Sequence, residues 1–181
     1  IMLKLFGWKV KLDGDVENLN RCILVVAPHT ANIEYILGNF SYWKLGKDLK
    51  VIIKDDHTKA WYGWIVKAIG GIGIDRSQKN NLVQFVVDQF EKEDFSLVIT
   101  PEGTRSWVPK WKKSFYHIAL QAKVPLVLAA GDFGTNTIFL GYKIPYEDLL
   151  TRSYEDIMQE IQQYYTKITP KHPEKWNPNI I

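Results

Sequence analysis

The sequence predicts an α/β domain whose central sheet is largely parallel and is flanked by helices. Two observations predict this class. Short apolar segments alternate with longer segments in which apolar residues recur every three or four positions, and strands that alternate with helices form parallel sheets. The run from Cys22 to Ala27 also contains no polar side chain, which is typical of a strand that is buried on both faces.

The expected elements follow one another along the whole chain. The predicted strands are short apolar runs and cover residues 22–27, 49–53, 72–74, 95–100, 125–130 and 137–143. The predicted helices have apolar residues at helical spacing and cover residues 32–44, 58–69, 81–92, 111–122 and 150–169. In the last helix Ser153 and Asp156 have the spacing of a capping box. Residues 170–181 contain proline and are expected to form an irregular tail.

Length and composition exclude several classes of protein. A chain of 181 residues has the length of one domain, so we expect residues 1–181 to fold as a single unit. Hydrophobic residues make up 46% and charged residues 24%, which excludes a disordered, collagenous or coiled-coil chain. Cys22 is the only cysteine, which excludes an internal disulfide and a cysteine-rich zinc site. No apolar run approaches the roughly 18–20 residues of a membrane span, and residues 1–10 lack the cleavage site of a signal peptide.

Positive charge is concentrated in the middle of the chain. Between Gly103 and Gly131 there is no acidic residue. The basic residues of this segment are Arg105, Lys110, Lys112, Lys113 and Lys123. Such a segment indicates an anionic partner, such as a phosphate, a coenzyme or a lipid headgroup, although it is also compatible with a solvated lysine-rich surface. We expect no nucleic-acid partner, because charges of both signs are mixed elsewhere and no recognition motif is present.

The segment from Ala60 to Ile69 is unusually rich in aromatic and aliphatic residues. Trp61, Tyr62 and Trp64 lie within it, and it is too apolar for a surface helix with one hydrophobic face. One interpretation is a buried helix. The other is a helix that lines an acyl channel or dips into a membrane surface, where tryptophan is favoured.

Polar clusters follow three of the predicted strands. His29 and Glu34 come after the strand that ends at Ala27, the pair Asp75-Arg76 follows the strand that ends at Ile74, and residues 101–106 follow the strand that ends at Thr100. Ligands of parallel sheets bind in the crevice beyond the carboxyl ends of the strands. The three clusters are therefore expected to meet in one site.

His29 and Glu34 are candidates for a general base and the carboxylate that orients it. Histidine titrates near neutral pH, and a carboxylate on its second nitrogen fixes the tautomer and stabilises the imidazolium. Residues five apart point about 140° apart on a regular helix. The pair can therefore meet only if His29 precedes the helix and Glu34 lies in its first turns. A purely structural histidine is the alternative.

Arg76 and Arg105 are candidates for an anion clamp. A guanidinium group holds phosphate oxygens with two parallel hydrogen bonds, and Gly103 lets the backbone approach an anion closely. The alternative is that both arginines form local ion pairs with Asp75 and Glu102. We expect no metal site, since the other histidines have no ligand spacing relative to His29. No nucleophile motif is present, so direct attack by an activated substrate hydroxyl is the simplest mechanism.

At these residues the sequence resembles the glycerolipid acyltransferase family, which includes the 1-acylglycerol-3-phosphate acyltransferases. That family carries four ordered blocks, and this chain matches them at His29 to Glu34, Gly71 to Arg76, Thr100 to Ser106 and Val124 to Ala129. The third match, Pro-Glu-Gly-Thr-Arg-Ser, is the most specific. All four blocks lie within residues 22–130 in the family's order.

The resemblance implies transfer of a fatty acyl group from acyl-CoA or acyl carrier protein to a hydroxyl of a lysophospholipid or glycerol-phosphate-like acceptor. It implies that His29 is the base and Glu34 its orienting carboxylate. The residues implied in acceptor or phosphate binding are Arg76, Glu102, Gly103, Thr104, Arg105 and Lys113. It implies no cofactor besides the acyl donor, and a cytoplasmic enzyme that is peripheral to the inner face of a membrane.

Two positions depart from the family's pattern. Glu34 stands where the family has aspartate, and one extra methylene displaces a carboxylate by roughly 1.5 Å, a distance that matters in a catalytic site. Thr100 replaces the aromatic residue of the third block. The glutamate leaves open a lipid- or phosphate-binding module with weakened or lost catalysis, and a third hypothesis is thioester hydrolysis.

Overall fold

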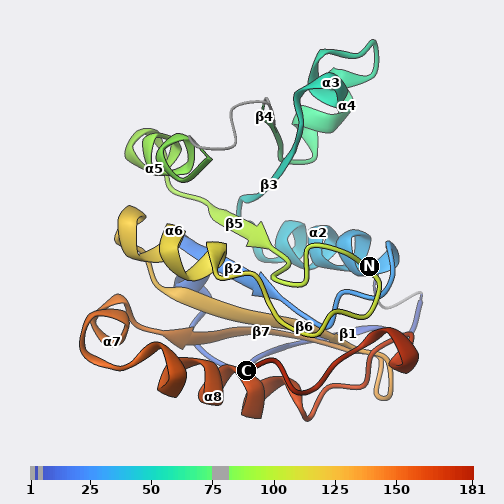
Figure 1. The fold of residues 1–181 in the computed structure, drawn as a ribbon. Helices are drawn as coiled ribbons and strands as arrows, with labels where there is room; N and C mark the ends of the chain where they lie inside the picture. Colours follow the sequence, from blue (N-terminus) through green and yellow to red (C-terminus); the bar gives the residue numbers. More distant parts are fainter. Residues whose placement is uncertain (1–2, 4–5, 75–81) are drawn as a thin grey trace.

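A computed structural model describes residues 3, 6–74 and 82–181. The strands form one seven-stranded sheet in the order β1-β7-β6-β2-β5-β3-β4. All neighbouring pairs are parallel except β6 and β7, which are antiparallel. The expected α/β class with a largely parallel sheet is therefore confirmed (Figure 1).

The elements alternate along the chain much as their apolar patterns indicate. The strands are β1 (Lys9–Leu12), β2 (Cys22–Val26), β3 (Leu49–Lys54), β4 (Gly71–Ile74), β5 (Ser96–Ile99), β6 (Leu126–Asp132) and β7 (Thr137–Ile144). The helices are α2 (Ile33–Leu45), α3 (Asp55–Lys59), α4 (Gly63–Ala68), α5 (Leu82–Lys92), α6 (Ser114–Ala122), α7 (Tyr146–Thr151) and α8 (Tyr154–Tyr165). Within the described residues, short 3-10 helices cover Val16–Leu19 and Pro173–Lys175.

The central strand β2 is buried on both faces and separates two apolar layers. Ile23 and Val25 belong to the cluster that contains the inner sides of α5, α6 and α8. Cys22 and Leu24 belong to the second cluster, with α2 and the N-terminal segment. This alternation is the two-residue period of a strand, and it explains why the run has no polar side chain.

The strand order places the loops that follow β2 and β5 next to each other. These two strands are parallel neighbours, with Cys22 opposite Ser96 and Val25 opposite Ile99. Their carboxyl ends therefore lie at one edge of the sheet. The chain leaves β2 through α2 toward β3 on one side, and leaves β5 through α6 toward β6 on the other. This is the kind of switch point at which parallel sheets bind ligands.

The sheet opens between β3 and β5. β3 pairs with β5 only through Leu49, Lys50 and Val51, whereas it continues to pair with β4 as far as Lys54. Beyond Val51 the outer pair of strands therefore diverges from the sheet. Figure 1 shows β3, β4, α3 and α4 rising away from the remaining strands.

Two expected helices are each divided in the structure. The helix expected at residues 58–69 is wrong: α3 begins at Asp55, and residues 60–62 separate it from α4. The helix expected at 150–169 has different bounds, because α7 ends at Thr151 and Ser153 is extended, with ψ 153°, but the capping box predicted at Ser153 and Asp156 is confirmed. The Ser153 side chain accepts a hydrogen bond from the Asp156 backbone N–H at 3.1 Å. It therefore caps a separate helix, α8.

The aromatic segment is exposed, so its interpretation as a buried helix is wrong. Trp61 is 88% exposed and Trp64 is 70% exposed. Both lie on the unit formed by α3, α4 and the residues between them. A search of the described residues finds no helix with both the length and the apolar character needed to cross a bilayer.

The last long helix is attached to the strand that leads into the predicted site. The hydroxyl of Tyr165, at the end of α8, donates to the Val25 carbonyl at 2.7 Å, and this side chain is 1% exposed. The same hydroxyl lies 3.3 Å from the Ala129 carbonyl of β6. One side chain therefore connects α8 to two adjacent strands.

We predict that Tyr165→Phe lowers the free energy of unfolding by about 1–3 kcal/mol, because it removes the donor of a fully buried hydrogen bond. Tyr164→Phe is the matched control, since its hydroxyl donates to Asp13 at 3.2 Å at a partly exposed position. Urea unfolding of both variants measures the two costs. Equal costs would contradict the importance given to the Tyr165 bond.

Candidate active site

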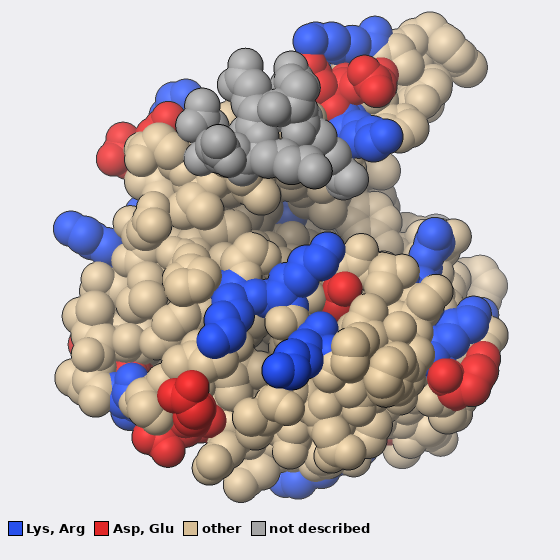
Figure 2. Space-filling model, in the orientation of Figure 1, with Lys and Arg blue, Asp and Glu red and all other residues tan. Residues whose placement is uncertain are grey.

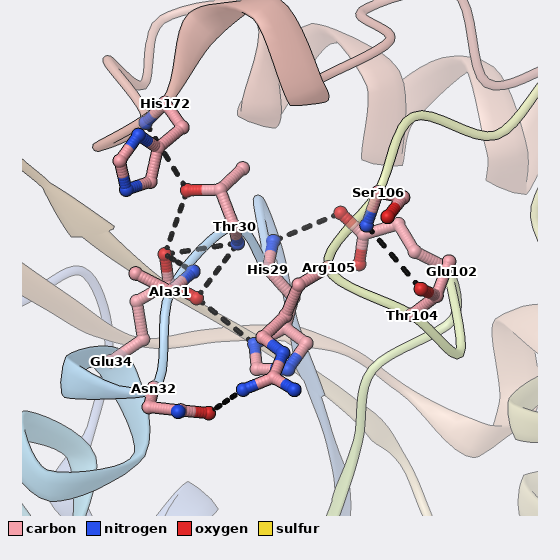
Figure 3. Close-up of polar contacts among 10 residues, drawn as sticks. All are labelled: His29, Thr30, Ala31, Asn32, Glu34, Glu102, Thr104, Arg105, Ser106 and His172. Carbon is pink, nitrogen blue, oxygen red and sulfur yellow. Dashed lines mark hydrogen bonds and ion pairs between the residues drawn. The ribbon is translucent and has the colours of Figure 1, made fainter.

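His29 lies three residues beyond the end of β2, and Glu34 is the second residue of α2. Their side chains meet: Nδ1 of His29 is 2.9 Å from Oε2 of Glu34 (Figure 3). The histidine precedes the helix and the carboxylate lies in its first turn, which is the arrangement that a spacing of five requires. The imidazole is partly exposed, at 21%, whereas the Glu34 side chain is 4% exposed.

The Glu34 carboxylate is fixed by the first residues of its own loop. It accepts hydrogen bonds from the backbone N–H groups of Thr30 and Ala31, each at 3.0 Å, and from the Thr30 hydroxyl at 3.0 Å. A helix N-terminus leaves N–H groups without intrahelical partners and favours negative charge. In the neutral imidazole, a carboxylate that faces Nδ1 favours the tautomer with the proton on Nδ1, which leaves Nε2 as the acceptor nitrogen.

The extra methylene of Glu34 does not prevent contact with His29. The glutamate reaches the imidazole and three further donors at the same time. The Thr30 hydroxyl also accepts from the backbone N–H of His172 at 3.3 Å. The C-terminal tail is therefore hydrogen-bonded to the residues that hold Glu34. Neither Thr30 nor His172 was singled out by sequence, because a bond across 142 positions has no local signal.

Glu102 connects the loop after β5 to the backbone of His29. Its Oε1 accepts the His29 N–H at 2.9 Å. Oε2 is buried and has no hydrogen-bond partner among the described residues. Burial raises the pKa of Glu102 from its ordinary value of 4.5 to about 7, and the hydrogen bond from His29 lowers it by less. The alternative of a local ion pair between Glu102 and Arg105 is wrong, since Glu102 points to the His29 backbone instead (Figure 3).

Arg105 reaches from the loop after β5 to the start of α2. Its guanidinium donates to the side-chain oxygen of Asn32, the residue before that helix (Figure 3). Both side chains are exposed at the surface. The first and third polar clusters of the sequence are thus brought together. Arg76, from the second cluster, lies outside the described residues. Asn32 was not predicted, because an amide before a helix is ordinarily read as a cap.

The remaining predicted residues differ in how they relate to this site. Gly103 has a φ of +67°, which disfavours any residue with a side chain, and the end of the Lys112 side chain lies against it. The Thr104 hydroxyl accepts from the Ser106 backbone N–H at 3.3 Å. Lys113 points elsewhere, with Nζ 4.3 Å from the centre of the Tyr154 ring on α8. Lys112, rather than its predicted neighbour, therefore lies against the loop after β5.

Figure 2 shows lysine and arginine side chains gathered at the centre of one face, where Figure 1 draws the segment after β5. This segment contributes exposed basic residues at Arg105, Lys110 and Lys112. The Lys112 backbone N–H donates to the Pro101 carbonyl at 2.9 Å, which folds the segment back on itself. The basic segment of the sequence is therefore placed beside His29.

A cavity of about 890 Å³ extends inward from the histidine. Its polar lining includes His29, Glu34 and Lys112. Most of the remaining lining is apolar and comes from α2 and strands β2, β3, β5, β6 and β7. The volume is within the range of small-molecule sites, which are largely apolar with a few polar groups at defined positions. The site combines a histidine held by a carboxylate, an edge of basic side chains and an apolar cavity.

A family model described as Acyltransferase matches residues 9–130. The fold and the site thus define an α/β protein with an oriented histidine at the mouth of an apolar cavity. The chain belongs to the acyltransferase family, and the resemblance seen in the sequence motifs is confirmed.

Curated relatives carry more specific names. The 1-acyl-sn-glycerol-3-phosphate acyltransferase of Saccharomyces cerevisiae is 24% identical over 140 residues, which are 70% of this chain and 44% of that protein. The protein of the same name from Cocos nucifera is 27% identical over 136 residues, covering 70% of this chain and 42% of its own length. The chain therefore spans less than half the length of these relatives.

A solved structure shares the fold. The crystal structure of the 1-acyl-sn-glycerophosphate (LPA) acyltransferase PlsC from Thermotoga maritima aligns with a TM-score of 0.58 and 18% identity. The alignment covers 91% of this chain and 72% of the other. At this identity the likeness supports the α/β architecture.

The raised pKa of Glu102 gives a pH-dependent prediction. Between about pH 4.5 and 7 the folded chain retains a proton that the unfolded chain has lost. Stability therefore falls as pH rises through this window, by on the order of 3 kcal/mol. Glu102→Gln removes this titration while its carbonyl oxygen still accepts the His29 N–H.

We predict that Glu102→Gln gains stability relative to the parent chain as the pH rises from 5 to 8. Urea unfolding at several pH values measures the difference between the two chains. If burying the amide of the new glutamine destabilises the variant by the same amount at every pH, this cost does not affect how the difference changes with pH. A difference that does not change with pH would show that Glu102 titrates normally.

Proposed function

We propose that this chain transfers a fatty acyl group from a thioester, acyl-CoA or acyl carrier protein, to a hydroxyl of a lysophospholipid or glycerol-phosphate-like acceptor. The observation that carries the proposal is the 2.9 Å contact between His29 and Glu34 at the mouth of an apolar cavity. Family membership and the names of the relatives support the same chemistry.

The reaction uses the unprotonated Nε2 of His29 as general base. Nε2 removes the proton of the acceptor hydroxyl while the hydroxyl oxygen attacks the thioester carbonyl. The carbon–sulfur bond then breaks, and the departing sulfur takes the proton from the imidazolium. Glu34 faces Nδ1 throughout and stabilises the positive charge that the ring carries between these two steps. The overall exchange is one ester formed and one thiol released.

The acceptor's phosphate is held at the edge of the cavity by the basic loop after β5. Arg105 presents its guanidinium beside the start of α2, and Lys112 lies against Gly103. The family resemblance adds Arg76 as a second guanidinium. Glu102 contributes by holding the His29 backbone, and Thr104 shapes the loop. Lys113 faces α8 and is the weakest member of the predicted set.

The apolar cavity accommodates an acyl chain. Its lining is predominantly hydrocarbon, and burying hydrocarbon contributes about 0.8 kcal/mol per methylene. The alternative of a binding module was motivated by Glu34 in place of aspartate, and the 2.9 Å contact between Glu34 and His29 supports the enzyme instead. Thioester hydrolysis differs only in that water replaces the acceptor, so product analysis with and without lysolipid separates the two reactions.

We predict that His29→Ala lowers kcat by about 10²–10⁴-fold, the usual contribution of a general base. The assay offers long-chain acyl-CoA and a panel of lysolipids and identifies products by mass spectrometry. Glu34→Asp is expected to lower kcat as well, because its shorter side chain withdraws the carboxylate by roughly 1.5 Å. Undiminished turnover of His29→Ala would reject the mechanism, and greater activity in Glu34→Asp would restore the weakened-enzyme hypothesis.

We further propose that the chain works at a membrane surface, docked through the unit formed by α3 and α4. Trp61, Trp64 and Ile65 are 88%, 70% and 43% exposed there, and the unit projects from the sheet (Figure 1). Lys54 and Lys67 are exposed beside them and complement anionic headgroups. Tryptophan is favoured at the boundary between lipid and water. The family resemblance implies a cytoplasmic enzyme, so we take the cytoplasmic leaflet as the docking surface.

We predict that replacing Trp61 and Trp64 together by alanine weakens binding to phosphatidylglycerol vesicles by tenfold or more, on the order of the apolar area that is lost. Vesicle co-sedimentation measures the partitioning. Trp43→Ala is the control, because Trp43 is 57% exposed on α2. If both proteins sediment like the parent chain, the docking surface has been assigned wrongly.

A further inference from the structure

Gly38 occupies the middle of α2 although nothing in the described backbone requires a glycine there. A Cβ atom built at this position would meet no atom of the described residues within 4 Å. The helix covers Ile33–Leu45 without interruption. Glycine inside a helix is roughly 0.5–1 kcal/mol less favourable than alanine. The missing side chain leaves an open space, and Gly38 lines the cavity that extends from His29.

Gly38 lies between two other residues that line the cavity. Glu34, Gly38 and Tyr42 are four positions apart, so they form one ridge along the helix. Glu34 holds the imidazole at one end of this ridge. The ridge advances about 1.5 Å per residue, so Gly38 and Tyr42 follow at roughly 6 and 12 Å from Glu34.

The Tyr42 side chain is held in place at the far end of the ridge. Its side chain is completely buried. Its hydroxyl donates to Ser96 at 3.0 Å, and Ser96 in turn donates to the Leu19 carbonyl at 2.7 Å. The Cys22 sulfur lies 3.2 Å from the same serine hydroxyl. A ring that is hydrogen-bonded through its tip and packed on all sides cannot move aside at low cost.

We propose that Gly38 determines the length of the acyl chain that this site accepts. Because Gly38 has no side chain, it leaves space for the acyl chain to pass along α2, and Tyr42 ends that passage. The proposal rests on the proposed function only in taking an acyl chain as the occupant of the cavity. The passage from Gly38 to Tyr42 is roughly 6 Å long. That length corresponds to about four or five methylenes at ~1.3 Å each.

The proposal is tested by filling the space at Gly38 in graded steps, with Gly38→Ala, Gly38→Leu and Gly38→Phe. We expect the preferred chain to become shorter in that order, with Gly38→Phe shortening it by about four carbons. Each methylene that no longer fits is expected to lower kcat/KM by roughly tenfold. Donors and acceptors of six to eighteen carbons are supplied in turn.

Two series identify which substrate's chain occupies the passage. In the first series the thioester chain is varied against one fixed lysolipid, and in the second the lysolipid chain is varied against one fixed thioester. A shift in the first series assigns the passage to the donor, and a shift in the second assigns it to the acceptor. Either result supports the role of Gly38, and no shift in either series overturns it.

Lys44→Phe is the matched control for the added ring. Lys44 is exposed on the same helix and is absent from the cavity lining, so we expect the parent's chain-length profile. Thermal unfolding of each variant checks that the fold is retained. If Gly38→Phe does not fold, Gly38→Leu carries the test, and a profile identical to the parent's in a folded Gly38→Leu overturns the proposal.

Direct binding separates this inference from the proposed function. Calorimetric titration with free fatty acids of eight to eighteen carbons measures how tightly each chain length binds, and it requires no turnover. A length limit that shortens in the Gly38 variants supports the passage even if the parent chain transfers no acyl group. Fatty-acid binding with the same length limit in the parent and in a folded Gly38→Leu would overturn the passage while leaving the chemistry of His29 untouched.

Discussion

The position of His29 depends on one buried carboxylate. Glu34 accepts from two backbone N–H groups and a hydroxyl at the start of α2, and its second oxygen faces Nδ1 of the imidazole. The carboxylate is therefore both the anion that the helix N-terminus favours and the group that sets the tautomer of the ring. Because these are the same atoms, the local fold of residues 29–34 and the chemistry of the site cannot be altered separately.

A second constraint comes from the sheet. β2 and β5 are parallel neighbours, so the loops that follow them emerge together, and Glu102 from one loop binds the backbone of the residue that begins the other. The carboxyl is buried without a partner for its second oxygen among the described residues, and this burial raises its pKa to about 7. The hydrogen bond that aligns the two loops is therefore made by a carboxyl group whose protonation changes near pH 7.

Helix α2 contributes to every part of the site. Its N-terminus holds Glu34, and the residue before it receives Arg105. Its inner ridge lines the cavity through Gly38 and Tyr42. The divergence of β3 from β5 beyond Val51 opens the sheet beside this helix. The imidazole contact, the contact to Arg105 and the apolar cavity are therefore arranged around one helix, and the helical repeat sets the distances between them.

The sequence by itself determined the α/β class, most strand and helix positions, and the residues at the strand ends, because apolar periodicity and local motifs are properties of neighbouring positions. It could not decide that Trp61 is exposed, or that Lys112 rather than Lys113 faces the loop of Gly103. These outcomes depend on which surfaces meet in three dimensions. Only the tertiary structure decided that Glu34 reaches His29, because side-chain reach depends on where the helix begins.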